Sequence, residues 1–137
     1  MLNRSGVVKE SYNNVTQILF NVEHQVSVPI MVDDSLVTSA DANGRKIVKA
    51  GTPLTGSLDA RTTPFTAASA GSSSDASNAV GVLLHDVDVT AGDENGTLLI
   101  FGFVNTARLD ETTAGKITEY VKAALPMITF ANMDDEA

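Results

Sequence analysis

The segment from Ala79 to Leu109 constrains the fold more than any other part of this chain. Two apolar runs rich in β-branched residues, 80–90 and 98–104, flank a polar stretch that contains Asn95 and Gly96. An Asn-Gly pair between two such runs indicates a hairpin, because both residues tolerate the positive φ that a tight turn requires. We therefore expect a β-hairpin that turns at Asn95 and Gly96.

Other turn and strand signals precede this hairpin. A second Asn-Gly pair lies between the apolar stretches 36–38 and 45–49 and predicts another hairpin. Apolar residues alternate from Gln25 to Val32, which predicts a strand. Pro29 places that strand at a sheet edge or beside a bulge, because proline has no amide hydrogen. The residues expected to set turns or close strand contacts are Asn43, Gly44, Gly51, Gly81, Asn95, Gly96 and Gly102.

The hydrophobic period changes after Leu109 and predicts one short helix. The apolar residues that recur at helical spacing are Ile117, Tyr120, Val121 and Ala124. Asp110 is the expected N-cap, Gly115 weakens the helix by about 1 kcal/mol relative to alanine, and Pro126 ends it. A final short strand or docking segment is expected at 127–130.

Composition narrows the class of protein. The chain has 137 residues, 43% hydrophobic and 5% aromatic, so we expect one domain with an aliphatic core. It has no cysteine, which excludes disulfides and thiolate sites and agrees with assembly in a reducing cytoplasm. Nine basic residues, mostly scattered, stand against 17 acidic ones, for a net charge of −8. Nucleic acid is therefore not an expected partner, and neither is a membrane, because no apolar run is long enough to span one. The chain is expected to be soluble and unprocessed.

These signals predict a mainly β (α+β) protein. We expect an extended N-terminal arm or extension at 1–24, a single β-rich domain at 25–131 and an acidic, frayed tail at 132–137. Within the domain, residues 57–78 are rich in Gly, Ser and Ala and predict a flexible loop.

The polar residues do not form a recognisable catalytic or metal motif. In a strand, Asp86 and Asp88 would share one face and His85 the other, so the three would not converge. The run 86–92 fails as a calcium loop because its glycine comes one position late and Thr97 stands where a bidentate glutamate belongs. Nucleophile-elbow and phosphate-binding motifs are also missing, so the sequence predicts no enzyme, cofactor or metal.

Four motifs in order carry a family resemblance. They are Ala-Gly-Thr-Pro-Leu at 50–54, Ala-Val-Gly-Val-Leu at 79–83, Asp-Val-Asp-Val-Thr-Ala-Gly at 86–92 and Ile-Phe-Gly-Phe-Val at 100–104. In this order the chain resembles the lambda-type bacteriophage head decoration proteins from about residue 47 to residue 109. The resemblance implies a small, compact β-barrel-like or β-tulip domain with a small helical part.

The same resemblance implies a structural protein of the virion. Such capsid cement proteins bind the outer surface of an expanded head as homotrimers at threefold and quasi-threefold sites, and they stabilise it by bridging major capsid proteins. The implied partners are the major capsid protein and further copies of this chain. The implied location is the outside of the capsid, and the host cytoplasm before assembly.

The resemblance also implies that the N-terminal arm orders on the shell. A β-prone arm can add a strand to an exposed sheet edge. The arm residues hypothesised to bind the capsid are Val7, Val8, Val15, Ile18 and Phe20. Residues 1–34 match the family poorly, so their packing on the body stays open. Three alternative functions also stay open: a phage tail or baseplate accessory, a generic β-barrel protein-binding module and a small hydrolase.

Overall fold

The computed structural model describes residues 17–133 of the chain, and its longest elements are two strands. In chain order the strands are β2 (Leu19–Val32), β3 (Ile47–Val48), β4 (Pro53–Thr55), β5 (Thr66–Ala67), β6 (Gly81–Leu83), β7 (Val87–Asp88), β8 (Glu94–Asn105) and β9 (Ile128–Ala131). The helical segments are η2 (Asp34–Leu36), η3 (Thr106–Arg108), α1 (Glu111–Ala114) and α2 (Glu119–Ala124).

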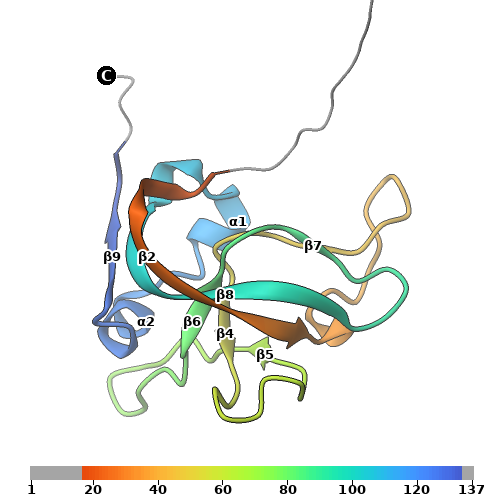
Figure 1. The fold of residues 1–137 in the computed structure, drawn as a ribbon, viewed down its shortest axis with the longest axis horizontal. Coiled ribbons are helices and arrows are strands. Elements are labelled where there is room, and N and C mark those ends of the chain that lie inside the picture. Colours follow the sequence, from red (N-terminus) through yellow and green to blue (C-terminus); the bar gives the residue numbers. More distant parts are fainter. Residues whose placement is uncertain (1–16, 134–137) are drawn as a thin grey trace, which may run out of the picture.

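Strand β8 runs through the centre of the main sheet (Figure 1). It pairs antiparallel with β2 on one edge, and on the other edge with β6 and then, in parallel, with β9. The sheet continues through β4 to β5, while β3 and β7 form a separate two-stranded ribbon. The expectation of a small, mainly β domain is confirmed.

The core divides into two clusters of mostly aliphatic side chains. The cluster on the side of the helices includes Ile18, Leu19, Leu99, Val104, Val121 and Ile128. The other includes Ile30, Val32, Leu54, Phe65, Leu83 and Leu98. Neighbouring residues Leu98 and Leu99 point to opposite sides of β8 and join different clusters, so this strand carries both halves of the core.

The hairpin over 79–109 forms, but its turn lies elsewhere than predicted. Strand β6 pairs with β8, with Val82 opposite Leu99. Asn95 and Gly96 lie inside β8, opposite Met31 and Ile30, so their assignment to the turn is wrong. The chain turns instead just before β8, where the Gly92 amide donates to the Val89 carbonyl at 3.1 Å. Gly96 is required for packing, because a Cβ there would lie 2.8 Å from Val32 Cγ2.

The second Asn-Gly pair does form a turn, but the predicted hairpin around it is wrong. Gly44 has a φ of +77°, and the Asp41 carboxylate accepts from the amides of Asn43 at 2.8 Å and Arg45 at 3.0 Å. The stretches 36–38 and 45–49 on either side of this turn do not pair with each other as strands. Ile47 and Val48 pair with β7 instead. The turn is therefore stabilised by its own carboxylate rather than by flanking strands.

Three other glycines allow close contacts. Gly51 has a φ of +94° in the turn before β4, and a Cβ there would lie 2.4 Å from Leu109 Cδ2. At Gly81 a Cβ would lie 2.5 Å from the Leu99 carbonyl oxygen, a backbone atom that cannot move aside. At Gly102 the nearest atoms would include Cβ of Gln25, 3.4 Å away on β2. The family-like motifs at 50–54, 79–83 and 100–104 each contain one of these close approaches.

The predicted single helix is two short helices, α1 and α2. Asp110 stands at the N-cap position of α1, as predicted, but its side chain makes no capping hydrogen bond. Thr118 caps α2 instead, accepting from the Val121 amide at 3.1 Å. The chain breaks near Gly115, where weak helix propensity coincides with the end of α1. Val121 is still buried against the sheet, as the spacing predicted.

The boundary of the arm and the assignment of Ile18 to it are corrected by the structure. Strand β2 begins at Leu19, so residues 19–24 belong to the sheet. Ile18 is 1% exposed and its carbonyl accepts from the Asn105 amide at 2.7 Å. Ile18 is a core residue and is not available to a partner.

The segment 57–78, predicted to be a flexible loop, contains β5 and the fully buried Phe65. The Phe65 amide donates to the Met31 carbonyl at 2.8 Å, and Thr118 Oγ1 donates to the Ala70 carbonyl at 2.7 Å. These bonds, together with the pairing of β5 with β4, join the segment to the body. Its mobility stays a prediction.

Candidate binding surface

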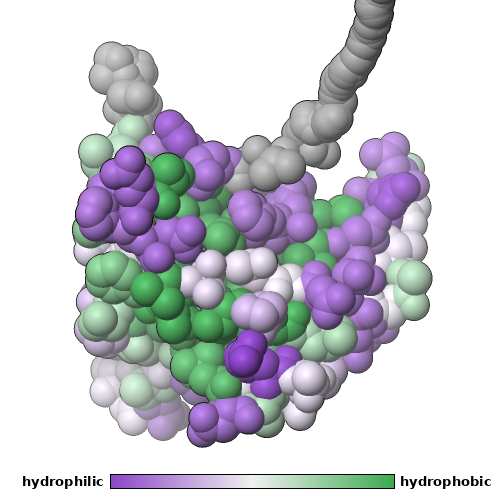
Figure 2. Space-filling view, viewed as in Figure 1, coloured by the Kyte–Doolittle hydropathy of each residue, from purple (hydrophilic) through white to green (hydrophobic). Residues whose placement is uncertain are grey.

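Three of the five phenylalanines of the chain gather on one face of β2 and β8. The Phe20 and Phe103 rings lie 5.5 Å apart between centroids, and Phe101 and Phe103 lie 6.4 Å apart. Val22 and Val26 extend this group and are 53% and 48% exposed. We call these five residues the β2–β8 patch. Figure 2 shows hydrophobic residues in a band over the side of the molecule where β2 crosses β8.

A bulge in β2 lies within this patch. Asn21 pairs with Phe103 and Val26 with Phe101, so four residues, 22–25, stand opposite one residue of β8. The Asn21 side-chain oxygen accepts from the amides of Glu23 at 3.0 Å and His24 at 3.2 Å, which stabilises the bulge locally. Val22 lies within this bulge and is exposed.

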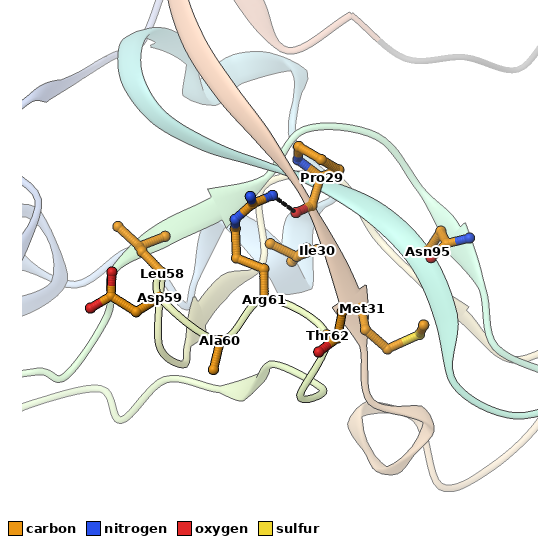
Figure 3. Close-up of a pocket in the computed structure, with 9 residues that line it drawn as sticks. All are labelled: Pro29, Ile30, Met31, Leu58, Asp59, Ala60, Arg61, Thr62 and Asn95. Carbon is orange, nitrogen blue, oxygen red and sulfur yellow. Dashed lines mark hydrogen bonds between the residues drawn. The ribbon is translucent and has the colours of Figure 1, made fainter.

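The outer edge of β2 is covered at its C-terminal end. The Met31 amide donates to the Arg61 carbonyl at 3.2 Å, and Nη1 of Arg61 donates to the Pro29 carbonyl at 3.0 Å (Figure 3). Leu58 and Asp59 of the same loop line a groove beside this edge. Pro29 therefore lies at an edge, as predicted, and the loop together with the bulge leaves β2 poorly suited to pair with another strand.

The patch adjoins the point where the N-terminal residues enter the domain. Nη1 of Arg108 donates to the Gln17 carbonyl at 3.2 Å, which holds the chain three residues before Phe20. Phe20 itself is 37% exposed, so of the hypothesised arm residues it is the one that the structure places at the surface. Val7, Val8 and Val15 lie outside the described residues.

Sequence reasoning missed four members of the patch: Val22, Val26, Phe101 and Phe103. Ile100-Phe101-Gly102-Phe103-Val104 is apolar at every position, so both faces of this strand carry apolar side chains. One face packs on the core through Val104, and Phe101 and Phe103 lie on the other, half-buried. A strand that is apolar on both faces, in a chain with so few aromatic residues, is the signal that could have indicated this patch.

The acidic residues that follow His85 accept hydrogen bonds from backbone amides. Asp86 accepts from the Ala50 amide at 2.7 Å. Asp88 accepts from the Thr90 amide at 2.9 Å and also contacts the Thr90 hydroxyl and the Arg45 guanidinium. The Thr90 hydrogen bonds, and then the Arg45 charge, hold the pKa of Asp88 below its ordinary value. These contacts hold the β3–β7 ribbon together at a solvent-exposed position.

Three other carboxylates come together from distant parts of the chain. Oxygen atoms of Asp33, Asp34 and Asp93 lie within 4.8 Å of one another. Asp93 accepts from the Asp34 amide at 2.9 Å, and Asp33 accepts from the Ser35 amide at 2.7 Å. Hydrogen bonds from Ser35 hold the pKa of Asp33 below its ordinary value. Together these contacts tie η2 to the turn before β8.

Acidification is expected to weaken the β3–β7 ribbon only at low pH. A carboxylate whose pKa is lowered by folding stabilises the fold fully above its unfolded pKa, and that stabilisation is lost as the pH falls toward the folded value. For Asp88 the loss begins below an ordinary value of 3.8. The Thr90 amide resonance, followed by NMR through a pH titration, should therefore show a midpoint below 3.8. A midpoint at or above this value would contradict the assigned hydrogen bonds.

No family model matches this chain, and no curated protein matches it either. In the part of the chain that the structure describes, no helix has both the length and the apolar content needed to cross a bilayer. The function is therefore inferred from the residues of the chain and their geometry.

Proposed function

We propose that this chain is a structural virion protein that binds the outer surface of an expanded phage capsid as a homotrimer. It stabilises the capsid by bridging major capsid proteins at threefold and quasi-threefold sites. The order of the four family-like motifs supports this function, and the β2–β8 patch is the observation in the fold that carries it.

The patch has the character of a protein-binding surface. It is apolar and aromatic, and it lies on the outside of a domain whose own core is complete. Contiguous exposed apolar groups often mark sites of protein-protein contact. Aromatic residues contribute much of the binding energy at such sites. In this proposal the patch and the N-terminal residues beside it form one continuous surface that faces the shell.

The proposed mechanism is adhesion, without chemical turnover. Each arm and patch contributes a contact of modest strength, and a trimer that makes three such contacts gains effective concentration. The net charge of −8 suits the outside of a head, away from packaged DNA. Bridging neighbouring capsid proteins then resists the outward pressure on the shell.

Mixing the purified chain with expanded heads that lack their decoration protein tests the function directly. We expect the protein to pellet with the heads and to raise their resistance to heat or chelator. Failure to pellet with intact shells would reject the proposal. Gel filtration separates the main alternatives, because a stable monomer that ignores capsids would instead indicate a protein-binding module of another kind, such as a tail or baseplate accessory.

The contribution of the arm can be isolated by a truncation that begins at Gln17. Removing residues 1–20 would also remove Ile18 and Leu19 from the core, so the shorter deletion is the correct one. We expect the truncated protein to keep its fold and trimeric state and to lose shell binding, since the arm supplies much of the contact. Unchanged pelleting of this variant would reject the role of the arm while leaving the patch as the binding surface.

A further inference from the structure

We propose that Asn43 is a site of spontaneous deamidation and that Asn95, although followed by glycine as well, is protected by the sheet. This inference does not depend on the proposed function. The chain contains two Asn-Gly pairs, and both asparagine side chains are exposed. The difference between them lies in the backbone of the glycine that follows, which supplies the attacking nitrogen.

The backbone around Asn43 can rearrange without disturbing the fold. Gly44 has a φ of +77°, and a Cβ at this position would find no atom within 4 Å. Its amide donates to the Asp41 carbonyl at 3.0 Å, a hydrogen bond within an exposed turn. Figure 1 shows the segment between η2 and β3 extending away from the body. Exposed turns open at little cost, whereas central strands open at up to the global free energy of unfolding.

The reaction needs only water and base. The Gly44 amide nitrogen loses its proton to solvent and attacks Cγ of Asn43, the bond from Cγ to the side-chain nitrogen breaks, and ammonia leaves with a proton from solvent. The product is a five-membered succinimide. Water then opens the ring: cleavage at Cγ gives aspartate, and cleavage at the backbone carbonyl carbon gives isoaspartate, whose main chain runs through the side chain.

At Asn95 the same ring cannot form in the folded chain. Gly96 stands opposite Ile30 in the β2–β8 ladder. Because the Met31 amide and carbonyl point outward to Arg61 and Phe65, the backbone groups of Ile30 point toward Gly96. A Cβ on Gly96 would lie 2.8 Å from Val32, so Gly96 is packed closely against β2 as well as paired with it. Asn95 should react only after this end of the β2–β8 ladder opens.

Conversion at Asn43 would alter the turn that holds Arg45. A new carboxylate would stand two residues from that of Asp41, whose pKa is held low chiefly by the amides of Arg45 and Asn43. Isoaspartate would also add one atom to the main chain between Asp41 and Arg45, which are joined by a 2.8 Å hydrogen bond from the Asp41 amide to the Arg45 carbonyl. The modified turn should therefore hold Arg45 less firmly against Asp88.

The test is to incubate the full chain in mildly alkaline buffer, natively and in concentrated urea, and to map peptides by mass spectrometry with isoaspartate detection. In the native sample we expect Asn43 to convert at least about tenfold faster than Asn95, since opening the sheet adds to the barrier at Asn95 alone. In urea the two rates should converge. Conversion at Asn43 should also rise with pH.

The variant Asn43→Gln provides the control, because glutamine would have to close a larger ring. It should abolish the fast reaction and leave the slow conversion of Asn95 unchanged. Equal native rates at the two asparagines would overturn the proposal. So would an unchanged Asn43 after a time in which the urea-treated chain has converted.

Discussion

Replacing Phe65 with alanine is expected to destabilise the domain by about 3–5 kcal/mol. Phe65 is fully buried in the second core cluster, and its removal leaves a cavity among aliphatic side chains. The Phe65 amide and carbonyl, which alanine retains, bond to Met31 and Asp33, so the loss measures the side chain alone. Equilibrium urea unfolding of the two proteins measures the difference.

Leu58→Ala is the matched control for this prediction. Leu58 lies seven positions earlier in the same segment but is 43% exposed, so its truncation should change stability by no more than about 0.5 kcal/mol. Near-equal losses for the two variants would contradict the burial of Phe65. They would also favour the mobile loop that the Gly, Ser and Ala content of this segment predicts.

Phe65 illustrates where sequence reasoning succeeded and where it failed. The alternation from Gln25 to Val32 and the apolar runs on either side of the hairpin are local signals, and they led to β2, β6 and β8. The 57–78 segment lacks such a signal, and one aromatic residue decides its position through a partner strand more than thirty residues away. Composition over a window averages out a single buried side chain.

Gly96 was assigned to the wrong element, and Asp110 lacks the expected capping bond, because a local motif has more than one structural use. Asn-Gly is favoured in turns for its backbone freedom, but a glycine is also required wherever side chains leave no space for a Cβ, as Val32 does at Gly96. Asp110 stands at the N-cap position of α1 without making the capping bond, while Thr118 caps α2. Choosing between these uses requires knowledge of the neighbouring strand or turn.

The β2–β8 patch could not be derived from either strand alone. Its members become neighbours only through the register of β2 on β8, and that register shifts around the Val22 bulge. The sequence did indicate that Phe20 contacts a partner, and Phe20 is exposed beside Phe103, whereas Ile18 is buried. Ile18 lies just before β2 and packs into the core, whereas Phe20 lies within the strand, beside Phe103.

Replacing Val22 and Val26 together with aspartate is expected to abolish shell binding by the otherwise intact protein. Both side chains are about half exposed, so the fold should tolerate the change. In the proposed complex they lie in the centre of a desolvated contact, where a buried charge without a partner is costly. A loss of about 2 kcal/mol per protomer lowers affinity about thirtyfold, and three linked contacts multiply the effect. Co-sedimentation with expanded heads over a range of protein concentrations measures it.

The control is Leu58→Asp, which makes the same kind of change at an exposed apolar residue outside the patch. It should bind heads like the unmodified chain, and both variants should keep the trimeric state and unfold at similar urea concentrations. Equal binding by the two variants would remove the patch from the shell interface. Binding lost in both would point instead to the groove beside β2, which Leu58 lines, as part of the contact.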